Sequence, residues 1–154
     1  MNAYPYIKNI DHEKVLKIAD QVNADADQVV SKTLAQNDFV SVTLFAFSKG
    51  EDISTHDSIG DAMVTVIEGC GKFIVDDKEY IVNQGESLVM PAKKPHSVHA
   101  VEAFKMMLVR IQVTKISLPI QATAEDLTDQ RTRIKTKVRI VQQTATKMQM
   151  MSIN

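Results

Sequence analysis

Up to Val113 the chain consists largely of short apolar segments that are rich in β-branched and aromatic residues. Glycine, proline and acidic residues separate these segments at close spacing, as is typical of antiparallel strands and tight turns. No helical pattern lies between them, which argues against a parallel α/β sheet. The sequence therefore predicts an all-β sandwich or barrel, with strands over residues 29–34, 40–47, 62–69, 72–75, 79–82, 86–91, 96–101 and 104–111.

Two local signals accompany the strands. The pair Asp76-Asp77 separates two of them and suits a tight hairpin turn. Upstream, Asp11 can cap a helix in which apolar residues recur at helical spacing. We therefore expect a lead-in segment, residues 1–29, ahead of a barrel over residues 30–113, and a short helix in that segment built on Val15, Ile18, Ala19 and Val22.

The charge balance changes near residues 113–118. Up to Val113 there are 11 Lys and Arg against 16 Asp and Glu, whereas the remainder has 7 against 3. The remainder also lacks glycine, histidine, cysteine and aromatic residues. We therefore treat residues 114–154 as a C-terminal appendage.

The appendage carries two competing patterns. Residues 132–140 alternate strictly between apolar or threonine positions and basic ones, which is the period of a strand with one solvated face. The absence of glycine and proline after Pro119 instead favours a helix over part of 124–150, with Thr123 and Asp126 as a capping box. Its apolar residues fall at heptad-like spacing, namely Leu127, Ile134, Val138, Val141, Ala145 and Met148.

Composition narrows the classes of function. The net charge of −1 and the scarcity of aromatic residues argue against nucleic acid as a partner. The longest apolar runs are too short to span a bilayer, and the N-terminus has no signal-peptide pattern. The single cysteine, Cys70, excludes an internal disulfide and fits a reducing compartment. We expect a cytoplasmic protein with no membrane partner.

Two segments share an unusual spacing of glycine, proline and histidine. In the first, Gly50 is followed after five residues by His56, and Gly69 closes the segment. In the second, Gly85 is followed after five residues by Pro91, and His96 comes five positions later.

These two segments together resemble the two motifs of the cupins, over about residues 30–112. The resemblance implies a double-stranded β-helix, that is, a jelly-roll barrel. The cupin pattern has a second histidine and a glutamate where this chain has Ser58 and Ala62. It also has glycine and asparagine where this chain has Lys93 and Ala100. Many small cupins with such departures have no assigned reaction, so the resemblance implies a barrel of unassigned activity.

In a cupin, the motif histidines point into the barrel and bind a metal. His56 and His96 are the two inward candidates here, and Asp61, one residue before the glutamate position, is a tentative third ligand. Imidazole and carboxylate suit a divalent transition metal: iron, manganese, nickel, copper or zinc. The alternative is a pocket without metal, in which the two histidines bind a small polar or anionic molecule.

Strand alternation suggests which other residues line that pocket. Val98 shares a strand face with His96, whereas His99 points to the other side. Ser58 can hydrogen-bond a histidine, and methionines fill irregular walls. Lys93 and Lys94 are expected in a solvated loop at the barrel mouth, where they could attract an anion. The predicted pocket residues are His56, Ser58, Met63, His96, Val98 and Met106.

These patterns are compatible with three functions. The first is a protein that binds a small molecule in the barrel. The second is a metal-dependent oxygenase, isomerase or lyase with His56 and His96 as metal ligands. The third is an interaction module that forms a homodimer and uses the appendage for a partner. The sequence assigns no catalytic residue, and a homodimer is expected in each case.

Overall fold

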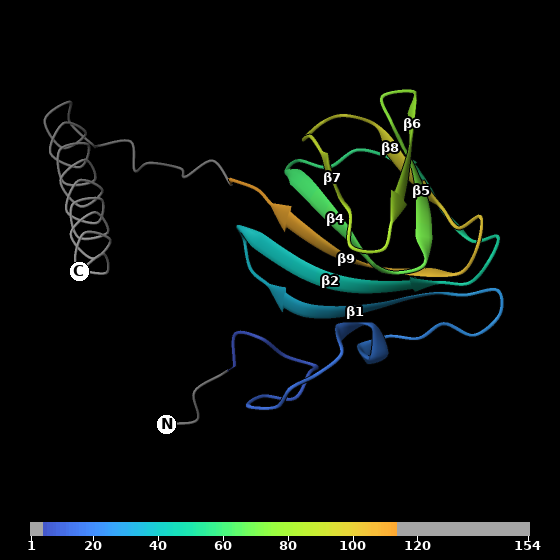
Figure 1. The fold of residues 1–154 in the computed structure, drawn as a ribbon. Helices are drawn as coiled ribbons and strands as arrows, with labels where there is room; N and C mark the ends of the chain where they lie inside the picture. Colours follow the sequence, from blue (N-terminus) through green and yellow to red (C-terminus); the bar gives the residue numbers. More distant parts are fainter. Residues whose placement is uncertain (1–4, 114–154) are drawn as a thin grey trace, which may run out of the picture. The chain divides into compact units, whose positions relative to one another are not determined.

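The computed structural model describes residues 5–113, which form two antiparallel sheets and one short 3-10 helix (Figure 1). The five-stranded sheet has the order β1-β2-β9-β4-β7, and the four-stranded sheet has the order β3-β8-β5-β6. No helix in this part of the chain is long and apolar enough to cross a membrane. The strands are β1 (Val29–Gln36), β2 (Val40–Phe47), β3 (Asp52–His56), β4 (Asp61–Glu68), β5 (Cys70–Val75), β6 (Lys78–Asn83), β7 (Ser87–Met90), β8 (His96–His99) and β9 (Phe104–Ile111).

The all-β prediction is confirmed, and each expected strand is present with ends shifted by at most two residues. Strand β3 was not predicted, because its residues Asp52–His56 are mostly polar and show no apolar alternation. Pairing with β8 places this strand, at Asp52–His99, Ile53–Val98 and His56–His96. The alternatives for the appendage lie outside the described residues.

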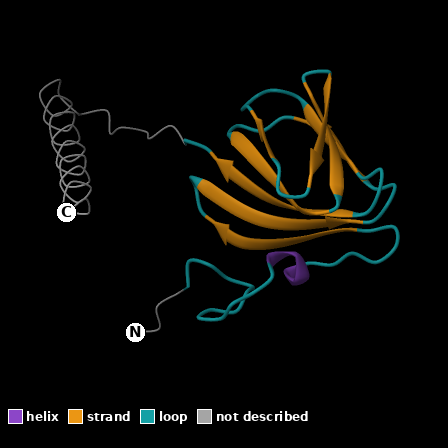
Figure 2. Cartoon of the chain, viewed as in Figure 1, coloured by secondary structure: helices purple, strands orange, loops and turns teal. Residues whose placement is uncertain are grey.

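The expected N-terminal helix is reduced to a single 3-10 turn, η1 (Ile18–Gln21) (Figure 2). Glu13 has a φ of 54°, which interrupts a helix at that point. Asp11 pairs with Lys14 at 2.9 Å instead of capping a helix, and Val15 is 99% exposed. The segment is therefore not an α-helix, although its apolar residues recur at helical spacing.

The lead-in segment nevertheless covers the outer face of the five-stranded sheet. Val22 is buried with Leu34, Leu44 and Ala46 in a cluster separate from the barrel interior. The ammonium group of Lys105, on β9, donates a hydrogen bond to the Ala19 carbonyl at 2.8 Å. One end of this sheet face is thus closed by chain that precedes β1.

The main core lies between the two sheets and closes one end of the barrel. Phe104 stacks on Phe47 with ring centroids 4.7 Å apart and meets Phe73 edge-on at 6.2 Å. All three rings are buried. Since alternate residues of β9 face inward, Met106, Leu108 and Arg110 follow Phe104 along the interior toward the other end. The barrel is therefore filled by aromatic rings at one end and hollow at the other.

The turns explain several residue choices. Asp76 and Asp77 have φ values of 52° and 66° and connect the paired residues Val75 and Lys78, as in a two-residue hairpin turn of type I′. Lys93 has a φ of 63° in the loop before β8. Its backbone amide donates to the Ser58 carbonyl at 2.8 Å, which joins two loops at the hollow end.

The left-handed backbone of Lys93 leads to a testable prediction. Lys93→Gly should raise the free energy of unfolding by about 0.5–1 kcal/mol, because relief of the left-handed strain exceeds the entropy cost of glycine. Chemical denaturation measures the change. Lys93→Ala removes the same exposed side chain but keeps the Cβ atom, so it should not stabilise. Equal stability of the two variants would contradict this explanation.

Candidate functional site

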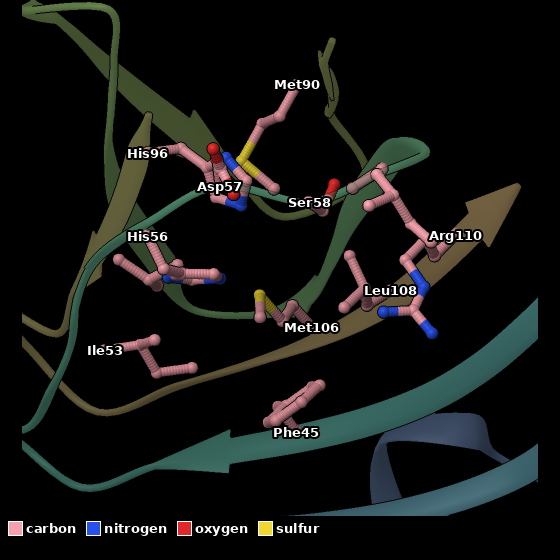
Figure 3. A pocket seen from close by; sticks show the side chains of 13 residues that line it. Phe45, Ile53, His56, Asp57, Ser58, Met90, His96, Met106, Leu108 and Arg110 are labelled. Carbon is pink, nitrogen blue, oxygen red and sulfur yellow. The ribbon is translucent and has the colours of Figure 1, made fainter. Parts of the chain in front are cut away.

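A cavity of about 350 Å³ occupies the hollow end of the barrel (Figure 3). Its polar lining comes from the loop after β3, from β8 and from the end of β9. Its apolar lining comes from inward residues of both sheets, among them Phe45, Ile53, Val98, Met106 and Leu108. A volume near the low end of roughly 300–1,000 Å³, typical of ligand pockets, suits one small molecule.

Two histidines meet in this cavity. The rings of His56 and His96 lie with centroids 4.5 Å apart and planes at 62°. His96 is only 4% exposed, whereas His56 lies at the solvent side. The two rings come from adjacent strands at paired positions of β3 and β8, so the sheet itself brings them together.

The backbone fixes the orientation and tautomer of both rings. Nδ1 of His56 lies 2.9 Å from the Ser54 carbonyl oxygen, and Nδ1 of His96 lies 2.9 Å from the Lys94 carbonyl oxygen. A carbonyl oxygen only accepts, so each neutral ring carries its proton on Nδ1. The Nε2 atom of each ring is therefore an acceptor, and no donor among the described residues bonds to either one.

A bulge in β3 re-aims the chain at its end, next to His56. The pairing with β8 shifts by one residue between Ile53 and His56. Ile53 faces the cavity, so in a regular strand His56, three residues later, would face away. The extra residue of the bulge turns His56 to the same side as Ile53. Asp57, which follows the last residue of β3, also lines the cavity.

Ser58 also lines the cavity, but its hydroxyl serves the loop. It donates a hydrogen bond to the Gly60 carbonyl, and the Ser58 carbonyl accepts from the Lys93 amide. The predicted hydrogen bond from Ser58 to a histidine is not formed. Ser58 therefore joins the two loops beside the cavity and does not support an imidazole.

Arg110 lines the cavity at the end of β9 and was not predicted from the sequence. The signal was present in the segment FKMMLVRI, where Phe104, Met106, Leu108 and Arg110 occupy alternate positions. An arginine that ends an otherwise apolar inward face points into the barrel. Arg110 is partly buried and makes no ion pair with any residue in the range 5–113.

Comparison with known proteins places the chain in a family. The model of the cupin domain family matches residues 43–111. A cupin superfamily protein from Desulfitobacterium hafniense is 31% identical, with a TM-score of 0.67, and the match covers 70% of this chain and 98% of that protein. This chain belongs to the cupin superfamily.

Two other solved structures are similar to this cupin. A conserved protein of unknown function from Streptococcus pyogenes is 42% identical with a TM-score of 0.70, over 73% of this chain and 99% of its own. A cupin 2 conserved barrel domain protein from Leptotrichia buccalis is 43% identical with a TM-score of 0.61, over 62% of this chain and 46% of its own. No curated protein matches the sequence.

The motif histidines His56 and His96 line the cavity, but two other predicted site residues, Met63 and Asp61, do not. Met63 is 41% exposed on the outer face of β4, since Ala62 and Val64 are the inward residues of that strand. Asp61 also points outward, and its carboxylate accepts a hydrogen bond of 2.8 Å from the Ala92 amide. Strand alternation in the β4 register therefore removes both from the cavity.

The cupin metal site is correspondingly incomplete. Within residues 5–113 no group of three His, Cys, Asp or Glu side chains is placed to hold a metal ion. The two Nε2 atoms are suitable nitrogen ligands, but Asp61 does not join them and Ser58 is committed to its loop. The facial triad of two histidines and Asp61 is not formed, and the residues present do not fit a metal held by three protein ligands.

The lysines of the mouth loop do not line the cavity. Lys94 forms an ion pair with Asp76 at 2.7 Å. The hydrogen bond from Lys94 and its charge lower the pKa of Asp76, and the same contacts raise the pKa of Lys94. The cationic group that does line the cavity is Arg110.

A serine, a histidine and an aspartate also lie close together on the outer face of the four-stranded sheet. Ser97 Oγ is 2.9 Å from His99 Nε2, and His99 Nδ1 is 3.8 Å from Asp52 Oδ2. Ser97 is only 3% exposed, and neither serine nor histidine lines a cavity found in the described part of the chain. This arrangement positions His99 and offers no site for a substrate.

Proposed function

We propose that this cupin binds a small polar or anionic molecule in the hollow end of its barrel. The observation that carries the proposal is the histidine pair, with both Nδ1 atoms bonded to the backbone and both Nε2 atoms left as acceptors. Both Nε2 atoms are available to a ligand, because no described residue donates a hydrogen bond to them. A ligand with hydrogen-bond donors can bind the two Nε2 atoms.

Binding is better supported than metal-dependent catalysis as an oxygenase, isomerase or lyase. The metal hypothesis depends on a third protein ligand, and Asp61 is turned outward. Direct binding requires only the two acceptors, the apolar wall and a mouth, and each is present.

The test is a variant that removes both Nε2 atoms and leaves the backbone contacts. Asparagine places an amide NH₂ near the position of Nδ1, so His56→Asn with His96→Asn can keep both bonds to the carbonyl groups. A panel of small carboxylates, polyols and amides is screened by thermal shift, and hits are titrated by calorimetry. The double variant should bind hits about ten- to hundredfold more weakly, as expected for two lost hydrogen bonds.

The matched control is His99→Asn, which changes a histidine outside the cavity. It should leave the affinities of all hits unchanged. Unchanged affinity in the double variant, or absence of any hit with the wild type, would overturn the proposed function.

We also propose a cytoplasmic homodimer as the working assembly. It is supported by exposed apolar side chains on neighbouring strands of the five-stranded sheet, namely Val89 on β7, Met63 on β4 and Ile111 on β9. Light scattering on the full chain, with Met63→Lys as the comparison, tests this assembly. A monomeric wild type would contradict it.

A further inference from the structure

We propose that the ligand is a small carboxylate with a hydrogen-bond donor at the opposite end of an apolar body. Arg110 binds the carboxylate, and the Nε2 atoms of His56 and His96 accept from the donor. This inference rests on the proposed function and specifies the class of molecule that the cavity takes.

Arg110 forms the cationic end of the cavity. It extends the inward row of β9 beyond Leu108, and in Figure 3 its guanidinium lies on the side of the cavity away from the histidines. It is partly buried, and no carboxylate in residues 5–113 pairs with it. A guanidinium has five donors and no acceptor, and its planar fork matches the two oxygens of a carboxylate.

The histidine pair forms the acceptor end. In the neutral rings the two Nε2 atoms only accept, because each ring proton is on Nδ1. Asp57, next to His56 in the chain, adds a negative charge to the same part of the lining. A ligand carboxylate would be repelled at this end and attracted to Arg110, whereas a hydroxyl or amino group has the hydrogens that this end requires. The charges therefore fix the direction of the ligand.

The middle of the cavity is apolar. Met106 and Leu108 lie between the two ends on β9, with Phe45 on the neighbouring strand β2 and Ile53 on β3 of the other sheet. Inward residues of one strand are roughly 7 Å apart, so Met106 and Arg110 are separated by about 14 Å along β9. A ligand that reaches both ends therefore needs an apolar spacer between its two polar groups.

The experiment titrates the full chain with four matched probes: hydroxyhexanoate with a terminal hydroxyl, the corresponding aminohexanoate, hexanoate, and terminal hydroxyhexanamide. NMR shifts of the amide groups give the dissociation constants. Hydroxyhexanoate or aminohexanoate should bind most tightly. Loss of the carboxylate charge should weaken binding about ten- to hundredfold, as for a charge-assisted hydrogen bond, and loss of the donor by about three- to tenfold.

Protein variants assign each end. Arg110→Gln should weaken hydroxyhexanoate to the level of hydroxyhexanamide and leave the amide unchanged. Arg110→Lys should give an intermediate loss, because the charge remains and the planar fork is lost. The matched control is Lys93→Gln, which removes an equal charge from the mouth loop outside the cavity and should change nothing. Amide spectra and melting curves verify that each variant is folded.

Two results would overturn the ligand class while the pocket function stands. One is a hydroxyhexanamide affinity equal to that of hydroxyhexanoate. The other is an Arg110→Gln variant that weakens all probes equally, which a structural role would produce. Failure of every probe to bind the wild type would also overturn the ligand class, and the broader panel of carboxylates, polyols and amides decides the pocket function separately.

Discussion

Replacing Phe104 with alanine should lower the free energy of unfolding by about 3–5 kcal/mol, the range for a large aromatic side chain removed from a packed core. The Phe104 ring stacks on Phe47 and meets Phe73 edge-on, so its loss removes an aromatic contact from each of two buried rings. Urea or guanidinium denaturation measures the change. The melting temperature of the variant should fall accordingly.

Phe39 provides the matched control because it is the same residue type and is 48% exposed in the turn between β1 and β2. Phe39→Ala should cost less than about 1 kcal/mol, as is usual for surface changes. Comparable losses in the two variants would show that the aromatic cluster does not organise the closed end of the barrel.

The second large effect is expected at Gly69, the last glycine of the first cupin motif. It has a φ of +77°, and an added Cβ atom would lie 2.8 Å from the Ala103 carbonyl oxygen. Gly69→Ala should therefore cost about 2–4 kcal/mol, as left-handed strain and overpacking against the backbone act together. Denaturant titration of the variant gives the value.

Gly85 separates these two causes. Its φ is +84°, but nothing lies within 4 Å of an added Cβ atom. Gly85→Ala should cost only about 1 kcal/mol, since the strain is partly offset by the reduced freedom of the unfolded chain. Equal costs at Gly69 and Gly85 would mean that contact with the Ala103 carbonyl is unimportant.

The fold was predictable because its signals are local. Apolar alternation identified the strands, and the spacing of Gly50, His56, Gly85, Pro91 and His96 identified the two motifs. The motif glycine Gly69 is required by backbone geometry, and such requirements do not depend on the ligand. The chain thus keeps the glycine, proline and histidine spacing of the cupin motifs, although Ser58 and Ala62 stand where the cupin pattern has two metal-binding residues.

The sequence-based predictions failed mainly where tertiary contacts determine the local structure. The polar strand β3 forms because β8 offers a pairing edge, and its bulge turns His56 into the cavity. The helix expected after Asp11 gives way to a lead-in segment that packs on the sheet. Met63 was assigned to the cavity by residue type, although the alternation around Ala62 already placed it outside.

Arg110 lines the cavity but was not among the predicted site residues. The candidate site was built from the motif histidines and their possible metal ligands, so a cation at the end of β9 was not considered. Once Phe104 and Met106 are assigned to the interior, alternation alone places Arg110 on the same face. A search for the odd residue on each inward face would have identified the anion-binding candidate before the structure.

The most direct test of the central claim is a ¹⁵N imidazole spectrum of the wild-type chain, recorded during titration with hydroxyhexanoate. The chain has four histidines. His56 and His96 should show the Nδ1-protonated tautomer, whereas His12, whose Nε2 lies 2.7 Å from the Ile7 carbonyl oxygen, should show the opposite one. Ligand should shift the Nε2 resonances of His56 and His96 and leave those of His12 and His99 in place. Unmoved resonances of the pocket pair with bound ligand, or Nε2 protonation of either ring before ligand is added, would contradict the account.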